Sequence, residues 1–245
     1  MSSFRNMLSI LDLFTLDRPT LKVDDIVNEL EITVPTCYRY LKQLSDVGLL
    51  AKLDSGEYIV GPKIIKLDRF IRLTTPTIVT ATPIMKELNE FTGCAVLLSN
   101  IYNDEVINIH VESNSETSQH ITYSRGVPHP LFVGSTSKII YAYLPNSRLK
   151  RMFNEYRAEI KAANLGDTFQ IFYHNLNKIR KAGYCISRGE LDDNLSGIAA
   201  PIFYKEQIIG SLTLVYPSAR EMVFNIDRLI ELVCTAAENI SLQSN

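Results

Sequence analysis

The residues best suited to chemistry lie on one short segment near the N-terminus. Thr36, Arg39 and Gln43 are spaced by three and four positions, so in a helix they share one face. An arginine fork matches O6 and N7 of guanine, glutamine pairs with adenine, and threonine contacts a thymine methyl group or a phosphate. This face therefore predicts a helix that reads base edges in the major groove of DNA.

Neighbouring residues are expected to add contacts to the phosphate backbone. Tyr38 and Tyr40 carry hydroxyls that suit phosphate oxygens, and Lys42 and Lys52 carry positive charge. The complete predicted DNA-binding set is Pro35, Thr36, Tyr38, Arg39, Tyr40, Lys42, Gln43 and Lys52. The side of the helix that faces the domain core is expected to consist of Val34, Cys37, Tyr38, Leu41 and Leu44.

The segments around this helix predict a winged helix-turn-helix domain over residues 1–61. Apolar periodicity predicts helices, and then strands around a turn, over 3–14, 23–30, 34–47, 49–53 and 57–60. Pro35 suits the first turn of the third helix, where its missing N–H costs nothing, and Gly48 suits its end. Three helices followed by a hairpin are typical of a winged helix.

A linker helix and a second domain follow. The linker, residues 62–75, has an apolar stripe formed by Ile64, Ile65, Leu67, Phe70, Ile71 and Leu73. Residues 76–245 mix helical and strand patterns, with helices expected over 80–91, 135–143, 146–155, 168–182 and 225–241. Strands are expected over 94–101, 105–111, 119–123, 184–187, 197–204 and 207–215. Antiparallel hairpins with flanking helices predict an α+β fold of the GAF-like type for this effector-binding domain.

Charge alone does not indicate DNA binding. Residues 1–68 hold 8 Lys and Arg against 10 Asp and Glu, and the whole chain has a formal net charge of −2. Four of those acids, Asp24, Asp25, Glu29 and Glu31, precede the reading helix. The case for DNA therefore depends on where the basic residues lie, and the alternative is a winged helix that binds proteins.

Composition and motifs argue against a membrane protein, a disulfide-bonded or zinc protein, and an enzyme. A hydrophobic content of 46 % suits a globular chain, no apolar run reaches the roughly 20 residues of a membrane span, and the N-terminus does not resemble a signal peptide, so a cytoplasmic location is expected. The four cysteines and four histidines are scattered, which predicts neither disulfides nor a zinc site, although a composite metal site stays open. No nucleotide-binding, esterase or metalloprotease motif occurs, and the pair Asp192-Asp193 is too close in sequence to converge, so no enzyme is expected.

The N-terminal motifs resemble the IclR family of transcriptional regulators. The run 33–41 (TVPTCYRYL) is similar to the recognition helix of that family, and 54–61 (DSGEYIVG) is similar to its wing. The matching positions are Thr36, Arg39, Leu41, Gly56, Tyr58 and Gly61. Val34, Pro35 and Tyr38 depart from the usual lysine, serine and histidine, so the resemblance does not supply the operator sequence.

Two C-terminal stretches resemble the effector-binding region of the same family. These are 125–138 (RGVPHPLFVGSTSK) and 183–201 (GYCISRGELDDNLSGIAAP). The residues that this resemblance places in the pocket are Gly134, Ser135, Thr136, Ser187, Gly197 and Thr213. Gly197, Ser187 and Asn194 replace the usual cysteine, aspartate and glycine, which leaves the pocket less acidic. A helix N-terminus at Gly134 suits an anion, so we expect an anionic or hydroxylated effector such as a small organic or sugar acid.

The resemblance also implies partners. It implies a homodimer joined through the DNA-binding domains and the linker helix, often assembled into a tetramer, on palindromic double-stranded operator DNA. The apolar stripe of the linker independently suits a partner helix. The effector is expected to change the spacing of the DNA-binding domains. The alternative is a sensor domain that has lost its pocket and responds to protein partners alone. Repression and activation are both open.

Overall fold

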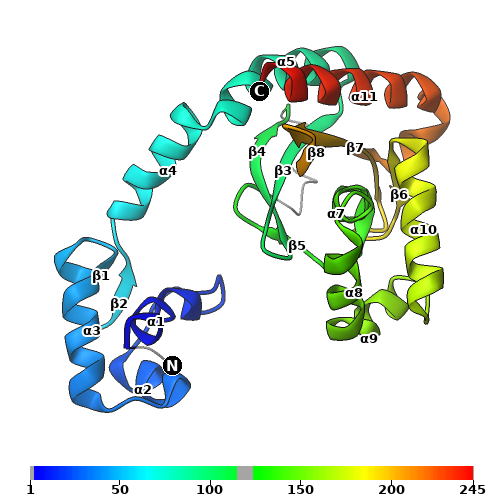
Figure 1. Ribbon diagram of the computed structural model, residues 1–245. Coiled ribbons are helices and arrows are strands. Elements are labelled where there is room, and N and C mark those ends of the chain that lie inside the picture. The colour runs from blue at the N-terminus through cyan, green and yellow to red at the C-terminus, as the bar shows by residue number, and fades with distance from the viewer. Residues whose placement is uncertain (1–2, 115–123, 245) are drawn as a thin grey trace. The chain divides into compact units, whose positions relative to one another are not determined.

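The computed structural model describes residues 3–114 and 124–244 and divides the chain into two compact units, Met1–Leu73 and Thr74–Asn245. The elements of the N-terminal unit are α1 (Ser3–Leu8), a 3₁₀ turn η1 (Leu11–Leu13), α2 (Val23–Leu30), α3 (Val34–Asp46), β1 (Leu50–Lys52), β2 (Tyr58–Val60) and α4 (Lys63–Thr74). Strands β1 and β2 pair antiparallel as the wing, so this unit is a winged helix-turn-helix (Figure 1). The predicted first helix is shorter than expected, because the chain turns after Leu8 to bury Ile10 completely.

Helix α3 has the boundaries that its sequence predicts. Thr33 is the extended N-cap residue, Pro35 lies in the first turn, and Gly48 follows the helix with φ of 78°. Its buried side chains are Cys37, Tyr40, Leu41 and Leu44. They pack on the completely buried Leu21 and Ile26, so one side of α3 is the core of the unit and the other is free to face a ligand.

Gly61 joins the wing to α3 at a distance that no other residue allows. A Cβ atom at this position would lie 2.2 Å from the carbonyl oxygen of Gly48. The N–H of Gly61 donates to the carbonyl of Leu49 at 2.8 Å, and the N–H of Lys63 donates to that of Gly48 at 3.0 Å. The glycine therefore lets the end of the wing lie against the turn that ends α3.

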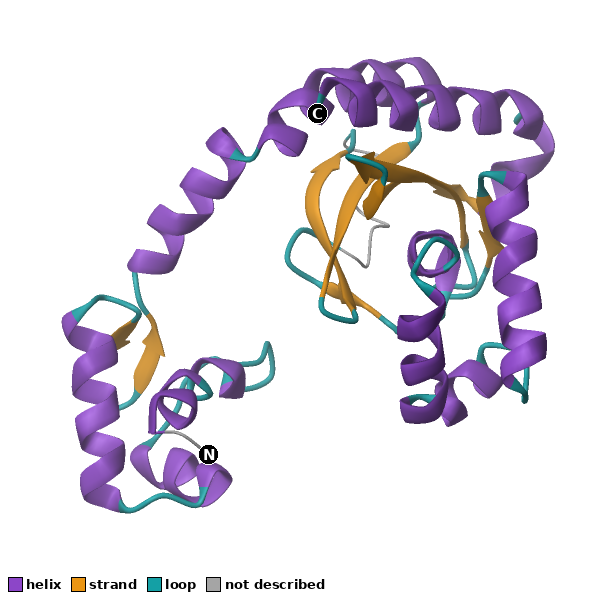
Figure 2. Cartoon of the chain, viewed as in Figure 1, coloured by secondary structure: helices purple, strands orange, loops and turns teal. Residues whose placement is uncertain are grey.

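The C-terminal unit is an antiparallel sheet with helices on both faces (Figure 2). Its strands are β3 (Ala95–Tyr102), β4 (Glu105–Glu112), β5 (Pro128–His129), β6 (Cys185–Arg188), β7 (Leu195–Tyr204) and β8 (Gln207–Pro217). Its helices are α5 (Pro76–Thr92), α7 (Gly134–Tyr141), α8 (Asn146–Glu155), α9 (Arg157–Ala162), α10 (Phe169–Ala182), the 3₁₀ turn η2 (Ser218–Val223) and α11 (Ile226–Gln243). Within the described residues the sheet has six strands in the order β5-β4-β3-β8-β7-β6.

Strand alternation divides the core into two layers. Leu98, Leu212 and Ile198 point to the face that α5 and α11 cover, and these two helices lie side by side across it (Figure 1). The residues between them along β3, β7 and β8 point to the opposite face, which α7 covers. There Ile139 and Ile140 of α7 pack with α8, α9 and α10.

The prediction of an α+β fold is confirmed, and most strands and helices lie within a few residues of their expected bounds. The short elements β5 and α9 were not predicted, because two to six residues carry too little periodicity to stand out. Helix α5 begins at Pro76 rather than near residue 80, since proline is favourable in a first turn. The predicted strand 119–123 lies outside the described residues.

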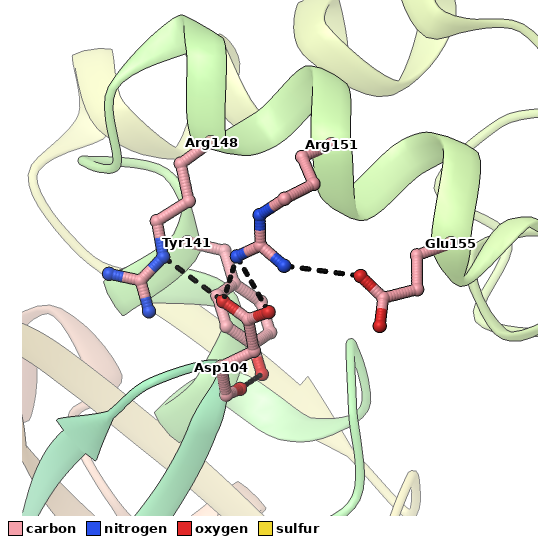
Figure 3. Close-up of polar contacts among 5 residues, drawn as sticks. All are labelled: Asp104, Tyr141, Arg148, Arg151 and Glu155. Atoms are coloured by element: carbon pink, nitrogen blue, oxygen red, sulfur yellow. Dashed lines mark hydrogen bonds and ion pairs between the residues drawn. The ribbon is translucent and has the colours of Figure 1, made fainter. Parts of the chain in front are cut away.

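An ionic cluster fixes the β3–β4 turn to α8 (Figure 3). Asn103 has φ of 54° and turns the chain so that Asp104 faces Arg148 and Arg151, whose guanidinium nitrogens lie 3.1 and 2.8 Å from its carboxylate. The Tyr141 hydroxyl donates to the Asp104 carbonyl at 3.1 Å, and burial, followed by the Asp104 charge, raises the pKa of Tyr141. The hydroxyl therefore stays protonated and ties the end of α7 to the same turn.

A buried polar chain crosses the face of the sheet beneath α7. Ser99 Oγ donates to Asn108 Oδ1 at 2.5 Å, and His129 Nε2 lies 2.8 Å from the same oxygen. An amide oxygen can only accept, so Nε2 carries a proton. His129 is 4 % exposed, and burial lowers its pKa to about 4, so the ring is neutral at pH 7.

We predict that His129 makes the fold less stable in acid. The unfolded chain takes up the histidine proton near pH 6.5, whereas the folded chain resists it until about pH 4. The free energy of unfolding should therefore fall as the pH drops through this window, by roughly 3 kcal/mol for this group. Urea unfolding of the wild type, His129→Gln and the exposed control His174→Gln at several pH values measures it. His129→Gln should flatten the pH dependence; the same slope in all three proteins would refute the assignment.

Candidate functional site

The exposed side of α3 presents a continuous polar face. Pro35, Arg39, Lys42 and Gln43 are exposed, and Thr36 is half-buried with its hydroxyl accepting from Thr33 Oγ1 at 2.9 Å. Amide, guanidinium and ammonium groups thus project from one side of a helix whose other side is core. This is the geometry that a major-groove helix requires.

The two tyrosines of α3 differ in burial from what the sequence predicts: Tyr40 is buried and Tyr38 is exposed. Tyr40 is 4 % exposed, and its hydroxyl lies 2.8 Å from Ser3 Oγ, so the expectation that it contacts phosphate is wrong. Tyr38 is 52 % exposed and does not belong to the buried side, where it was also expected. The guanidinium of Arg39 lies 5.5 Å from the centre of the Tyr40 ring, so Tyr40 supports Arg39 from within the domain.

Acidic residues near α3 have structural partners. Asp25 accepts the backbone N–H of Lys22 at 2.9 Å at the start of α2, and Glu29 pairs with Arg18 at 3.1 Å.

On the wing, Lys52 is exposed, with its ammonium 5.8 Å from the Tyr58 ring centre. A basic wing residue beside a polar helix face suits phosphate on either side of a groove.

The C-terminal unit contains a pocket at the N-terminus of α7. It is a small cavity that is partly open to solvent. It brings together five of the predicted effector residues, which come from α7, β6, β7 and β8: Ser135, Thr136, Ser187, Gly197 and Thr213. Gly134 lies just outside this lining, at the first position of α7.

The pocket hydroxyls are paired with one another across elements. Ser187 Oγ donates to Ser135 Oγ at 3.2 Å, and Thr136 Oγ1 lies 3.0 Å from Thr213 Oγ1. Each of these residues is less than 10 % exposed. Because a hydroxyl both donates and accepts, each pair keeps capacity for a further hydrogen bond to a ligand.

Gly197 leaves room in the middle of this group. A Cβ atom there would lie 2.8 Å from Ser135 Oγ and 3.4 Å from Ser187 Oγ. Glycine within a strand often marks a point where a ligand approaches the backbone closely. The absence of a side chain at Gly197 therefore leaves space in the pocket that a Cβ atom would fill.

Two carboxylates in the pocket were not predicted. Glu190 and Asp192 lie on the loop between β6 and β7 and line the cavity, so the pocket has two carboxylates even though Ser187 stands where the family usually has aspartate. Glu190 Oε2 accepts the N–H of Gly134 at 2.9 Å and lies 2.5 Å from Lys138 Nζ. Both Lys138 and Glu190 stand in the motifs that carried the resemblance, but neither motif reveals that they meet.

The remaining lining residues are His129, Ser196 and the apolar Leu97, Leu191, Leu195 and Val215. Near the pocket, burial raises the pKa of Cys185 to about 12, so its thiol stays protonated and is a weak nucleophile at pH 7. The described residues include no group of three or more His, Cys, Asp and Glu that could hold a metal ion. In the same part of the chain, no helix is long and apolar enough to cross a membrane.

Relatives cover nearly the whole chain at low identity. The HTH-type transcriptional regulator KipR of Bacillus subtilis (strain 168) is 24 % identical over 236 residues, which are 96 % of this chain and 93 % of KipR. The HTH-type transcriptional regulator KdgR of Escherichia coli (strain K12) is 22 % identical over 224 residues, which are 90 % of this chain and 84 % of KdgR.

Solved structures share the fold. The IclR transcriptional regulator from Alicyclobacillus acidocaldarius has a TM-score of 0.83 at 20 % identity, with 99 % of this chain and 98 % of that chain covered. An IclR homologue from Microbacterium hydrocarbonoxydans, complexed with 4-hydroxybenzoate, has a TM-score of 0.80 at 18 % identity, with 99 % of each chain covered.

Family descriptions match both units. Residues 74–242 match "Bacterial transcriptional regulator IclR C-terminal", and residues 4–54 match "IclR helix-turn-helix domain". The first region covers nearly all of the C-terminal unit, and the second lies within the N-terminal unit and ends before β2 and α4. This chain therefore belongs to the IclR family of transcriptional regulators.

Proposed function

We propose that this regulator binds a palindromic operator through α3 and the wing and is modulated by a small organic or sugar acid in the pocket at α7. The observation that carries the DNA half is the polar face of α3, where Arg39, Lys42 and Gln43 are exposed together. We further propose that it works in the cytoplasm, as a binding protein rather than an enzyme.

The proposed homodimer is supported by α4. This helix has no buried residue, and six large apolar side chains of it are between 37 % and 72 % exposed. Exposed apolar stripes on a soluble protein mark interaction sites, and the same stripe on a second copy is a complementary partner. Two copies would present two recognition helices to half-sites related by a twofold axis, which is the basis for a palindromic operator.

We predict that Arg39→Ala weakens specific DNA binding by about 1–3 kcal/mol, because it removes a bidentate contact to guanine. The measurement is a fluorescence-anisotropy titration on DNA from upstream of the protein's own coding sequence, with random DNA as reference. Arg39→Lys keeps the charge without the fork and should recover only the sequence-independent part of binding. Lys161→Ala, an exposed charge change on α9, is the matched control.

Two outcomes would contradict the DNA proposal. One is equal binding by wild type and Arg39→Ala at every salt concentration. The other, at concentrations well above Kd, is a stoichiometry of one chain per duplex, which would exclude the dimer.

The proposal of an acidic effector rests on how the donors and acceptors of the pocket are arranged. The first N–H groups of a helix have no partner within it, so those of Ser135 and Thr136 suit a carboxylate. Asp192 offers acceptors for ligand hydroxyls, and the leucines suit a carbon skeleton. The 4-hydroxybenzoate bound by the Microbacterium hydrocarbonoxydans homologue combines an acid with a hydroxyl, as a sugar acid does.

We predict that hydroxylated acids raise the melting temperature of the protein saturably, because a ligand that binds the native state alone stabilises it by about 2.7 kcal/mol at 100 times its Kd. Thermal unfolding with 4-hydroxybenzoate, gluconate and related acids measures this, with toluene as the apolar comparison. Gly197→Ala should lower the affinity at least tenfold, since its Cβ pushes on Ser135 Oγ. Stabilisation by toluene and by none of the acids would overturn the proposal.

We propose that effector binding changes the association of the chains, and through α4 the spacing of the two DNA-binding domains. Coupling of about 1–3 kcal/mol between the two binding events suffices for regulation. This is the step that would convert occupancy of the pocket into a change at the operator.

A further inference from the structure

Two consecutive side chains attach the loop between β6 and β7 to α7. Glu190 reaches from this loop to the Gly134 N–H and the Lys138 ammonium, at 2.9 and 2.5 Å. The next residue, Leu191, packs on Gly134, where a Cβ atom would lie 2.8 Å from its Cδ1. Glu190, Leu191 and Asp192 all line the pocket, so the loop is one of its walls.

The position that Glu190 holds is suited to any carboxylate. Gly134 offers an N–H that α7 itself does not use, and Lys138 offers a positive charge on a side chain that is 11 % exposed. A buried ammonium needs a negative partner, so this charge must be matched by Glu190 or by another anion. The Glu190 side chain is 31 % exposed, so its carboxylate can turn toward water when another anion takes its place beside Lys138.

The loop is otherwise tied to itself and to η2. The Gly189 N–H donates to Leu195 O at 3.0 Å, and the Leu195 N–H donates to Asp192 O at 2.9 Å. The Ser218 N–H donates to Asn194 O at 2.7 Å, and Arg188 pairs with Glu221 at 2.7 Å. Gly189, with φ of 62°, allows the turn at its base. If Glu190 no longer binds Gly134 and Lys138, the loop keeps these hydrogen bonds and this ion pair, while its contact with α7 weakens.

We propose that Glu190 is an internal competitor of the effector: its carboxylate holds the anion position at the start of α7 and keeps the loop closed, and an acidic effector replaces it and releases the loop. The second half rests on the proposed function, because it assumes that an acid binds in this pocket. It follows that a neutral ligand of the same shape cannot open the loop, because it leaves the Lys138 charge unmatched.

The first half is tested without any effector, by hydrogen–deuterium exchange of the full chain. Glu190→Ala should raise the exchange rate of the segment 188–196 at least tenfold. Acetate, which has the two carbons and two oxygens that this substitution removes, should raise the melting temperature of the variant saturably, because the anion position is vacant there, and should leave that of the wild type unchanged. Asp193→Ala, an exposed carboxylate of the same loop, is the matched control, and chloride at equal ionic strength controls for salt.

Wild-type exchange rates in Glu190→Ala, or a melting temperature of that variant that acetate does not raise, would overturn the proposal. Should that variant fold poorly, Glu190→Gln keeps the size and removes the charge, and it should raise the same exchange rate. An acid that stabilises the wild type should bind Glu190→Gln at least tenfold more tightly, and equal affinity would refute competition. None of these arms depends on DNA, and the acetate arm stands even if no acid of the panel binds, so failure here is distinct from failure of the proposed function.

Discussion

The complete burial of α7 against a polar face of the sheet is the constraint on which the C-terminal unit depends. Every residue of Gly134–Tyr141 is buried. A buried helix needs partners for its polar side chains, and the sheet provides Thr213 for Thr136, at 3.0 Å, and Ser187 for Ser135, at 3.2 Å. Ser211 Oγ also donates to the carbonyl of Thr136 at 3.2 Å. The small residues that allow this approach also leave the cavity beside it, so packing and pocket have one origin.

The two ends of α7 have different surroundings, and this difference places the site. Toward the C-terminus, Ile139, Ile140 and Tyr141 join the apolar layer with α8 and α10, and Tyr141 is tied to the turn at Asp104. Toward the N-terminus the neighbours are hydroxyls and the Glu190–Lys138 pair. One end is therefore fixed by packing, while the other offers the hydrogen bonds and charge that a small acid would exchange for its own.

The sequence predicted the elements well where periodicity is strong and poorly where tertiary contacts decide. Helix α3 could be delimited from Thr33, Pro35 and Gly48, because capping and turn chemistry are local. The burial of Tyr40 could not be predicted from the local sequence, since it depends on a contact with Ser3, 37 positions away. In the pocket, the hydroxyl residues came from the resemblance, whereas Glu190 was missed because its two partners lie more than 50 positions away in the chain.

We propose for the protein as a whole that occupancy of the pocket changes the affinity for operator DNA. Binding linkage tests this most directly: the Kd for DNA is measured with and without a saturating acid that stabilises the protein, and the Kd for that acid with and without DNA. Both should change by the same factor, about 5- to 150-fold. A DNA affinity that is the same with and without the bound acid would refute the coupling.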